Sequence, residues 1–214
     1  GTDASGTIDV NGDGPALFEH SGIVVSGANG VVIGGLAAGE GNLISGNDYH
    51  GIEVGPGSSQ VLIQGNVIGT DLSGTLALGN GSGICVWEAD EGVVIGGSAA
   101  GASNVISGNH NVGILLGRLT QGAVVQGNLI GLAADGQTEL ANRNGGIEVT
   151  QSAQVQIGTD GDGVNDAAEG NVIVAPGAAA VAIASSSDTV VAGNRLGTNA
   201  GGTVALGLGV GVSL

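Results

Sequence analysis

The feature that most constrains the fold of this chain is an internal repeat with a period close to 62 residues. VVIGG at 31–35 returns at 93–97, and VQIGT takes the same place at 155–159. A repeat unit of this size can bury its apolar side chains only against its neighbours, so the repeat predicts a stack of similar units. Other segments recur near the same spacing: GNVIG at 65–69, GNLIG at 127–131 and GNRLG at 193–197; GTDASGT at 1–7, GTDLSGT at 69–75, GLAADGQ at 131–137 and GTNAGGT at 197–203; NLISGN at 42–47, NVISGN at 104–109 and NVIVAP at 171–176.

Each unit nearly repeats itself a second time. Two short apolar segments, the second directly after an Asn, follow each Gly-Ile-x-Val-type segment. With 46 Gly among 214 residues and no sustained helical spacing of apolar residues, helices are excluded, because Gly costs about 1 kcal/mol in a helix. Three strands in about 31 residues predict an all-β, three-sheet parallel β-helix of about 6–7 coils, with residues 1–214 as one domain. The first strands are expected to start near Ile23, Ile52, Ile84, Ile114, Ile147, Val181 and Val210.

The aliphatic residues are expected to form the core. Val, Ile and Leu supply 59 residues, whereas Trp, Tyr and Phe occur once each and Met does not occur. Coils spaced about 4.8 Å apart place Ile52, Ile84 and Ile114 directly above one another. One Asn per coil is expected to hydrogen-bond along the stack through its side-chain amide. These residues are Asn42, Asn66, Asn104, Asn128, Asn171 and Asn194.

Taken together, GTDLSGT, NVISGN and GNVIG resemble segments of the right-handed parallel β-helix proteins of the pectate-lyase-like superfamily, especially long bacterial repeat proteins. The resemblance covers almost the whole chain. It implies a right-handed coil and secretion or display at the cell surface. It implies no single activity, since the superfamily contains lyases, hydrolases, epimerases and adhesins. In its enzymes the first sheet and the loops before it form the sugar-binding groove.

The charge of the chain excludes two classes of partner. Nineteen acidic residues face three Arg and no Lys, which gives a net charge of −16. A nucleic-acid ligand or an anionic membrane surface requires a basic patch, which this chain lacks. No apolar run is long enough for membrane insertion. The single cysteine, Cys85, has no partner for an internal disulfide and is expected at a partly exposed, outward strand position.

One loop has the composition of a metal site. The segment between the second and third strands grows from nine residues in 34–42 and 96–104 to fourteen in 158–171. Calcium prefers six to eight oxygen ligands, and Asp-x-Asp-Gly spacing allows carboxylates to converge. The loop is not an EF-hand, because Val164 and Asn165 stand where that motif requires an oxygen ligand and Gly. Calcium is therefore the predicted cofactor, with a solvated acidic loop as the alternative. The candidate ligands are Asp160, Asp162, Asp166 and Glu169.

A second group of polar residues gathers along the first strands. All three His and one Arg lie just before such strands, and stacking places them along one edge. The middle residue of each Ile-x-Val segment points outward, which places Glu53 and Glu148 on the same face. This face is a candidate surface for a polysaccharide or a cell-surface glycan, with a solvated outer face as the alternative. The candidate carbohydrate-binding residues are Tyr49, Trp87, Glu148 and Arg143.

A carbohydrate-active enzyme of lyase, hydrolase or epimerase type is the alternative. Its candidate catalytic residues are Asp48, His50, Glu53, Glu88 and the nearby His110. Glu53 and Glu148 lie three coils apart, about 14 Å, whereas a glycosidase pair needs about 5–10 Å. The lack of Lys also disfavours proton abstraction from an acidic sugar.

The sequence thus favours a non-catalytic structural or adhesive module of an extracellular or cell-surface protein. A passive polysaccharide-binding module remains a further alternative. The first and last residues fall inside repeats, which predicts a fragment of a longer repeat array. Because open coil ends expose strand edges, end-to-end self-association is also expected.

Overall fold

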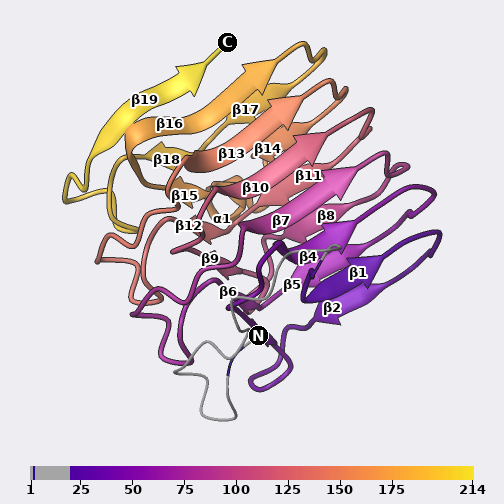
Figure 1. The fold of residues 1–214 in the computed structure, drawn as a ribbon. Helices are drawn as coiled ribbons and strands as arrows, with labels where there is room; N and C mark the ends of the chain where they lie inside the picture. Colours follow the sequence, from indigo (N-terminus) through magenta and orange to yellow (C-terminus); the bar gives the residue numbers. More distant parts are fainter. Residues whose placement is uncertain (1, 3–19) are drawn as a thin grey trace.

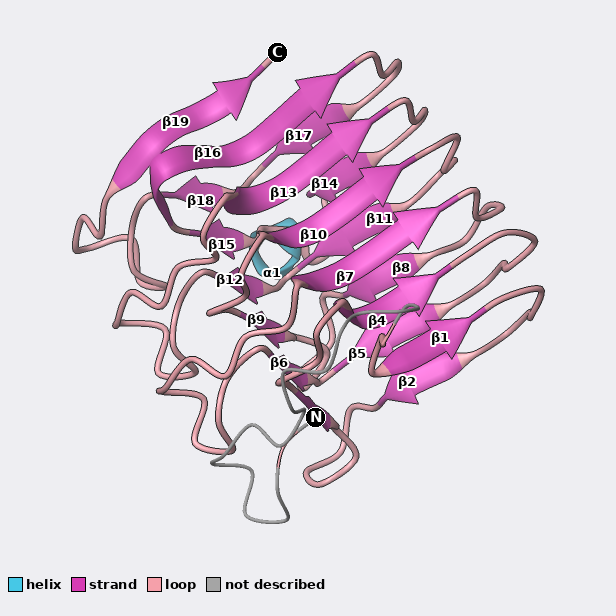
Figure 2. Ribbon diagram, viewed as in Figure 1, coloured by secondary structure: helices cyan, strands magenta, loops and turns pink. Residues whose placement is uncertain are grey.

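The computed structural model describes Thr2 and residues 20–214 of the chain. The described residues form a three-sheet parallel β-solenoid of about 6 turns with about 32 residues per turn, as predicted (Figure 1). Figure 2 shows that helix in the described part of the chain is confined to α1, Asp166–Glu169, in the long loop of residues 158–171. Among the described residues, no helix has the length and apolar character needed to cross a membrane.

Successive coils contribute one strand each to three sheets. The first sheet contains β1 (Ile23–Val25), β4 (His50–Val54), β7 (Ser82–Trp87), β10 (Val112–Gly117), β13 (Gly145–Thr150), β16 (Ala175–Ala184) and β19 (Leu208–Ser213). The second contains β2 (Val32–Gly34), β5 (Leu62–Gln64), β8 (Val94–Gly96), β11 (Val124–Gln126), β14 (Gln156–Gly158) and β17 (Val190–Ala192). The third contains β3 (Leu43–Ile44), β6 (Val67–Ile68), β9 (Val105–Ile106), β12 (Leu129–Ile130), β15 (Val172–Ile173) and β18 (Arg195–Leu196).

The register of the first sheet confirms the predicted column of aliphatic side chains. Ile52 pairs with Ile84, and Ile84 pairs with Ile114. All three side chains are fully buried, and burying an Ile contributes roughly 1.5–3 kcal/mol. In the last strand Val212, and not the Val210 named in the prediction, continues the column above Val181. The shift is two residues, which preserves the face of each side chain, so the alternation in GVGV allowed either register.

The predicted asparagine ladder is confirmed over six rungs, from Asn42 to Asn194. At each step the Nδ2 of one Asn donates to the Oδ1 of the next at 2.9–3.0 Å. The backbone N–H of the same residue donates to that Oδ1 as well. Each inner rung is thus hydrogen-bonded to both neighbours, which fixes the coils in one register.

A second ladder, which the sequence analysis did not predict, runs parallel to the first. Asn47, Asn80, Asn109 and Asn142 are joined by Nδ2 to Oδ1 hydrogen bonds of 2.6, 3.0 and 2.8 Å. This ladder lies just before the first sheet and spans the coils that contain β4, β7, β10 and β13. These coils are therefore held at two corners.

The glycine before each inward Ile is required by close packing. A Cβ on Gly83 would lie 2.5 Å from the carbonyl oxygen of Gly113 and 2.6 Å from Cγ2 of Ile106. A Cβ on Gly51 or Gly113 would lie 2.7–2.9 Å from the equivalent atoms, which are a Gly carbonyl oxygen, an Asn Nδ2 and an Ile Cγ2. The Gly-Ile pair that marks each coil in the sequence is thus a consequence of the distance between coils.

The recurring GTDLSGT-type loops are stabilised by their own Asp or Asn. Asp71 accepts hydrogen bonds from the N–H groups of Thr75 and Leu76, and Asp135 accepts them from Gln137 and Thr138. Partial burial opposes ionisation of Asp71, but the hydrogen bonds outweigh it and lower the pKa. Hydrogen bonds likewise lower the pKa of Asp135. These contacts explain why the loops recur without a ligand.

Candidate functional site

A hollow of about 350 Å³ lies on the outer face of the first sheet, over β4, β7 and β10. It collects the two large aromatic residues of the predicted carbohydrate face, Tyr49 and Trp87, together with one basic residue, Arg118. The remaining lining residues are His50, Glu53, Cys85, Val86, Asn111, Leu115, Gly117 and Thr150. We refer to it as the Trp87 hollow.

Glu53 holds Trp87 in place. The indole Nε1 of Trp87 donates to Oε1 of Glu53 at 3.0 Å, and the hydroxyl of Ser21 donates to Oε2 at 2.8 Å. The Glu53 side chain points outward as predicted, yet only 4% of the residue is exposed. Both carboxylate oxygens therefore already have donors, which is a poor arrangement for an acid or a nucleophile and a good one for fixing an aromatic ring.

Arg118 completes the aromatic wall. Its guanidinium carbon lies 5.6 Å from the centroid of the Trp87 ring, within the range of a cation–π contact. Arg118 follows β10 with a positive φ of 48°, and Glu88 follows β7 with a φ of 51°. The left-handed backbone turns the chain away from the strand direction at this position. In the coil of β10 this brings Arg118 to the Trp87 ring of the neighbouring coil.

His50 lies inside β4 rather than before it and is buried. Its ring centroid is 3.9 Å from that of Tyr49. Burial lowers the pKa of His50 below 6.5, although the charge of Glu53 opposes this shift. The imidazole is thus neutral at pH 7, and its buried Nδ1 has no hydrogen-bond partner among the residues that the structure describes.

Cys85 is not partly exposed, as the sequence analysis expected. It pairs with Glu53 in the sheet register and is 5% exposed. Burial, followed by the charge of Glu53, raises the pKa of the thiol to about 12, although Arg118 opposes the shift. The thiol is therefore protonated and unreactive.

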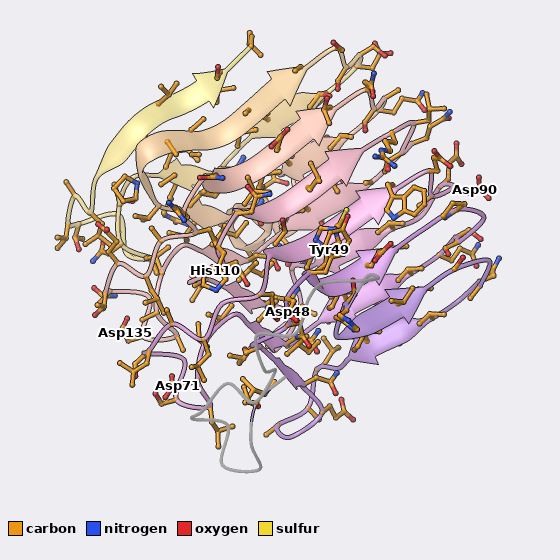
Figure 3. The ribbon with its side chains drawn as sticks, in the orientation of Figure 1. Asp48, Tyr49, Asp71, Asp90, His110 and Asp135 are labelled. Atoms are coloured by element: carbon orange, nitrogen blue, oxygen red, sulfur yellow. The ribbon has the colours of Figure 1, made fainter. Side chains whose placement is uncertain are left out.

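The structure separates the predicted catalytic residues. His50 and Glu53 line the Trp87 hollow, whereas Glu88 lines a neighbouring hollow and Asp48 and His110 line neither. In Figure 3, Tyr49 lies over the strands of the first sheet, and His110 lies toward the side where the chain enters them. The structure therefore does not assemble these five residues around one point.

The remaining carbohydrate candidates, Glu148 and Arg143, do not line the hollow. Glu148 follows Glu53, Cys85 and Leu115 in the outward row of the sheet, which confirms the separation of three coils. Arg143 is exposed before β13. The arginine that lines the hollow is Arg118, whereas the sequence analysis had named Arg143. Arg118 directly follows a first strand, as Glu88 does in the neighbouring coil, and this position is the sequence signal that could have identified it.

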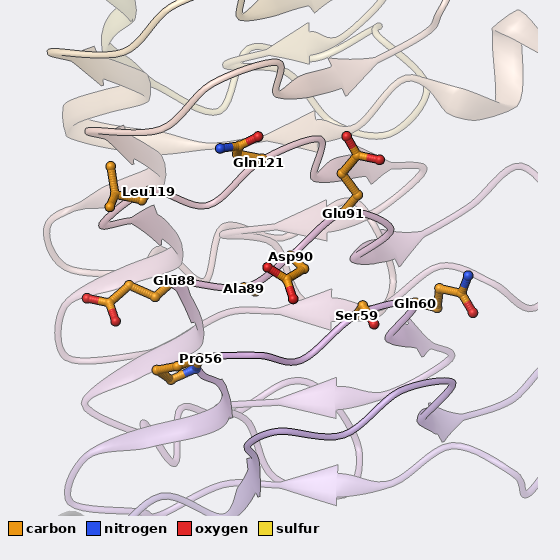
Figure 4. A pocket seen from close by; sticks show the side chains of 9 residues that line it. All are labelled: Pro56, Ser59, Gln60, Glu88, Ala89, Asp90, Glu91, Leu119 and Gln121. Atoms are coloured by element: carbon orange, nitrogen blue, oxygen red, sulfur yellow. The ribbon is translucent and has the colours of Figure 1, made fainter.

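An acidic hollow of about 720 Å³ borders the Trp87 hollow, beyond the ends of β4, β7 and β10. Glu88, Asp90 and Glu91 line it together with Gln60, Gln121 and Leu119. Figure 4 shows that the three carboxylates point in different directions. They are therefore a solvated acidic rim and do not converge on one ligand position.

The long loop brings three of the four predicted calcium ligands together. Asp160, Asp166 and Glu169 each place one carboxylate oxygen within 4.8 Å of the others. Glu169 is only 7% exposed, and its Oε2 accepts a hydrogen bond from the N–H of Asp160 at 3.3 Å. Asp162 is outside this group and accepts a hydrogen bond from the N–H of Val164.

Three comparisons with known proteins complete the description. No protein-family model, curated protein or solved structure matches the chain.

Proposed function

We propose that this chain is a non-catalytic adhesive module of a secreted or cell-surface protein, which binds a glycan in the Trp87 hollow. The observation that supports binding without turnover is the pair of hydrogen bonds on Glu53, from Trp87 and Ser21. They occupy the carboxylate that an enzyme would use and fix the ring on which a pyranose would stack. The resemblance to pectate-lyase-like proteins points to the same sheet.

Trp87 provides both the binding surface and the reporter, because it is the single tryptophan of the chain. Titration with a panel of neutral and acidic polysaccharides is expected to change its fluorescence without formation of sugar products. Trp87→Ala should weaken binding by about tenfold or more in affinity electrophoresis, since a central aromatic contact contributes at least 1.4 kcal/mol.

Two further variants separate binding from catalysis. Glu53→Gln retains an acceptor for the indole and is expected to bind nearly as well as the wild type. Val32→Ala, at an exposed position of the second sheet, is the control and should bind normally. Products that disappear in Glu53→Gln would establish the enzymatic alternative, and a panel without any binding would refute the glycan site.

We propose in addition that the long loop binds calcium. Three carboxylates converge there, one of them buried, and no basic side chain of the described residues forms a hydrogen bond with them. A site with three protein carboxylates and the rest of its ligands from water or carbonyl groups has an expected dissociation constant on the order of 10⁻⁴–10⁻³ M.

Calcium at 100 times that constant is expected to stabilise the fold by about 2.7 kcal/mol, seen as a rise in melting temperature. Glu169→Gln preserves the acceptor for the N–H of Asp160 but removes the charge, and should abolish the rise. Asp162→Asn is the matched control, because Asp162 is in the same loop but outside the group, and should retain it. Equal losses in both variants, or no heat of calcium binding, would contradict the site.

A further inference from the structure

Trp87 stands between two glycines in the outward row of the first sheet. Gly55 follows β4 in the coil on one side, and Gly117 of β10 pairs with Trp87 on the other. The indole leans toward Gly55, because a Cβ on that glycine would lie only 3.6 Å from Cε2 and Cζ2 of the ring, less than the coil spacing of about 4.8 Å. The opposite face of the indole is therefore turned toward Gly117.

Gly117 forms the floor of the Trp87 hollow. It is buried, yet a Cβ built on it would meet only Thr150 among the described residues within 4 Å, with Cγ2 at 3.4 Å and the carbonyl oxygen at 3.8 Å. Gly117 also lines the hollow, so the space above it is the hollow itself. The absence of a side chain at this position thus creates the space that borders the free face of Trp87.

The space above Gly117 has the thickness of one sugar ring. Trp87 pairs with Gly117 and Gly117 pairs with Thr150, so Trp87 and Thr150 are two coils apart, about 9.6 Å. A ring between the indole and the Thr150 methyl group needs two contacts of about 3.5–4.0 Å, whereas two stacked rings need three contacts, more than about 10 Å in all. The volume of about 350 Å³ is likewise near the lower end of ligand pockets, which measure roughly 300–1,000 Å³.

The walls of the hollow prevent a glycan chain from running through it along the solenoid axis. The indole fills the outward row on one side of Gly117, and Thr150 stands on the other side. Along the strand, Leu115 is the outward residue before Gly117, and Arg118 follows it. The guanidinium of Arg118, 5.6 Å from the ring centroid, is farther away than a stacking contact and is placed to donate hydrogen bonds to sugar hydroxyls. A sugar residue must therefore enter from solvent with one end first.

We propose that the Trp87 hollow receives a single terminal pyranose residue, either the end of a glycan chain or a one-residue branch, stacked on the indole above Gly117. This inference rests on the proposed glycan binding and specifies which part of the glycan is bound. The remainder of the glycan extends away from the first sheet into solvent.

The first test is a titration of Trp87 fluorescence with the methyl glycosides of glucose, galactose, mannose, xylose and N-acetylglucosamine. At least one of them is expected to give a saturable change and to displace a bound polysaccharide. A polysaccharide that binds but that none of the glycosides displaces would overturn the single-residue site and leave glycan binding intact. If neither glycosides nor polysaccharides bind, the proposed function fails together with this inference.

The second test fills the floor of the hollow. Gly117→Val adds a β-branched side chain, which strands favour, and should raise the dissociation constant of the bound glycoside at least tenfold while the melting temperature stays close to that of the wild type. Ala184→Val is the matched control, because Ala184 continues the same outward row beyond Thr150 and does not line the hollow. It should bind like the wild type. A folded Gly117→Val variant with wild-type affinity would overturn the proposal, and so would equal losses of affinity in both variants.

Discussion

Replacing Asn104 by alanine is expected to lower the free energy of unfolding by about 3–5 kcal/mol. Asn104 is fully buried, and its Oδ1 accepts from the N–H and Nδ2 of Asn66. Its Nδ2 donates to the carbonyl oxygen of Ile63 and to Oδ1 of Asn128. The substitution would leave these buried groups without their partner, and each unsatisfied group costs about 1–3 kcal/mol. Urea unfolding followed by circular dichroism measures the change.

Two variants separate the hydrogen bonds from the packing. Asn104→Leu nearly preserves the volume and is expected to destabilise the protein as strongly as Asn104→Ala. Asn144→Ala removes an exposed amide that donates to Asn111 and should change stability by no more than about 0.5 kcal/mol. If Asn144→Ala and Asn104→Ala lower the free energy of unfolding equally, the buried ladder contributes no more to stability than an exposed amide hydrogen bond.

Replacing Gly83 by alanine is expected to destabilise the fold by about 3 kcal/mol, because the added methyl group overpacks the corner between two coils. The new Cβ would lie 2.5 Å from the carbonyl oxygen of Gly113 and 3.1 Å from Nδ2 of Asn109. Backbone and ladder atoms surround it, so the conflict cannot be relieved by rotating a flexible side chain. Thermal unfolding of the variant measures the loss.

Gly117→Ala is the matched control in the same sheet. Its nearest contact would be Cγ2 of Thr150 at 3.4 Å, which is an ordinary van der Waals distance. We expect a change of less than about 1 kcal/mol. If both alanine variants have the same stability, the Gly-Ile pair is not a packing requirement.

The fold was predictable because successive coils repeat the same three strands and bury equivalent aliphatic side chains. Ile52, Ile84 and Ile114 recur with the same neighbours, so their burial in one column followed from the spacing. The second ladder was missed although Asn47 and Asn109 end the motifs NLISGN and NVISGN, because Asn80 and Asn142 stand in segments of different sequence. The register of β19 was missed because its apolar residues alternate with Gly, so two registers satisfied the same pattern.

The candidate site was less predictable, because it depends on contacts across coils. The outward position of Glu53 followed from strand alternation, but its burial depends on Ser21 and Trp87 from the coils on either side. Arg118 reaches Trp87 only because the backbone after β10 adopts a left-handed conformation at a residue other than Gly. Each contact joins residues from different coils, so the sequence of a single repeat unit does not predict it.

The double ladder has a consequence for molecular recognition. Trp87, Glu53 and the backbone that carries Arg118 all belong to coils that Asn47, Asn80, Asn109 and Asn142 tie together at a second corner. A rigid scaffold of this kind would order the groups of the proposed glycan site before a ligand arrives, so little conformational entropy would be lost on association. Under the proposed function, affinity at this position would be set by the fit of the ligand rather than by rearrangement of the protein.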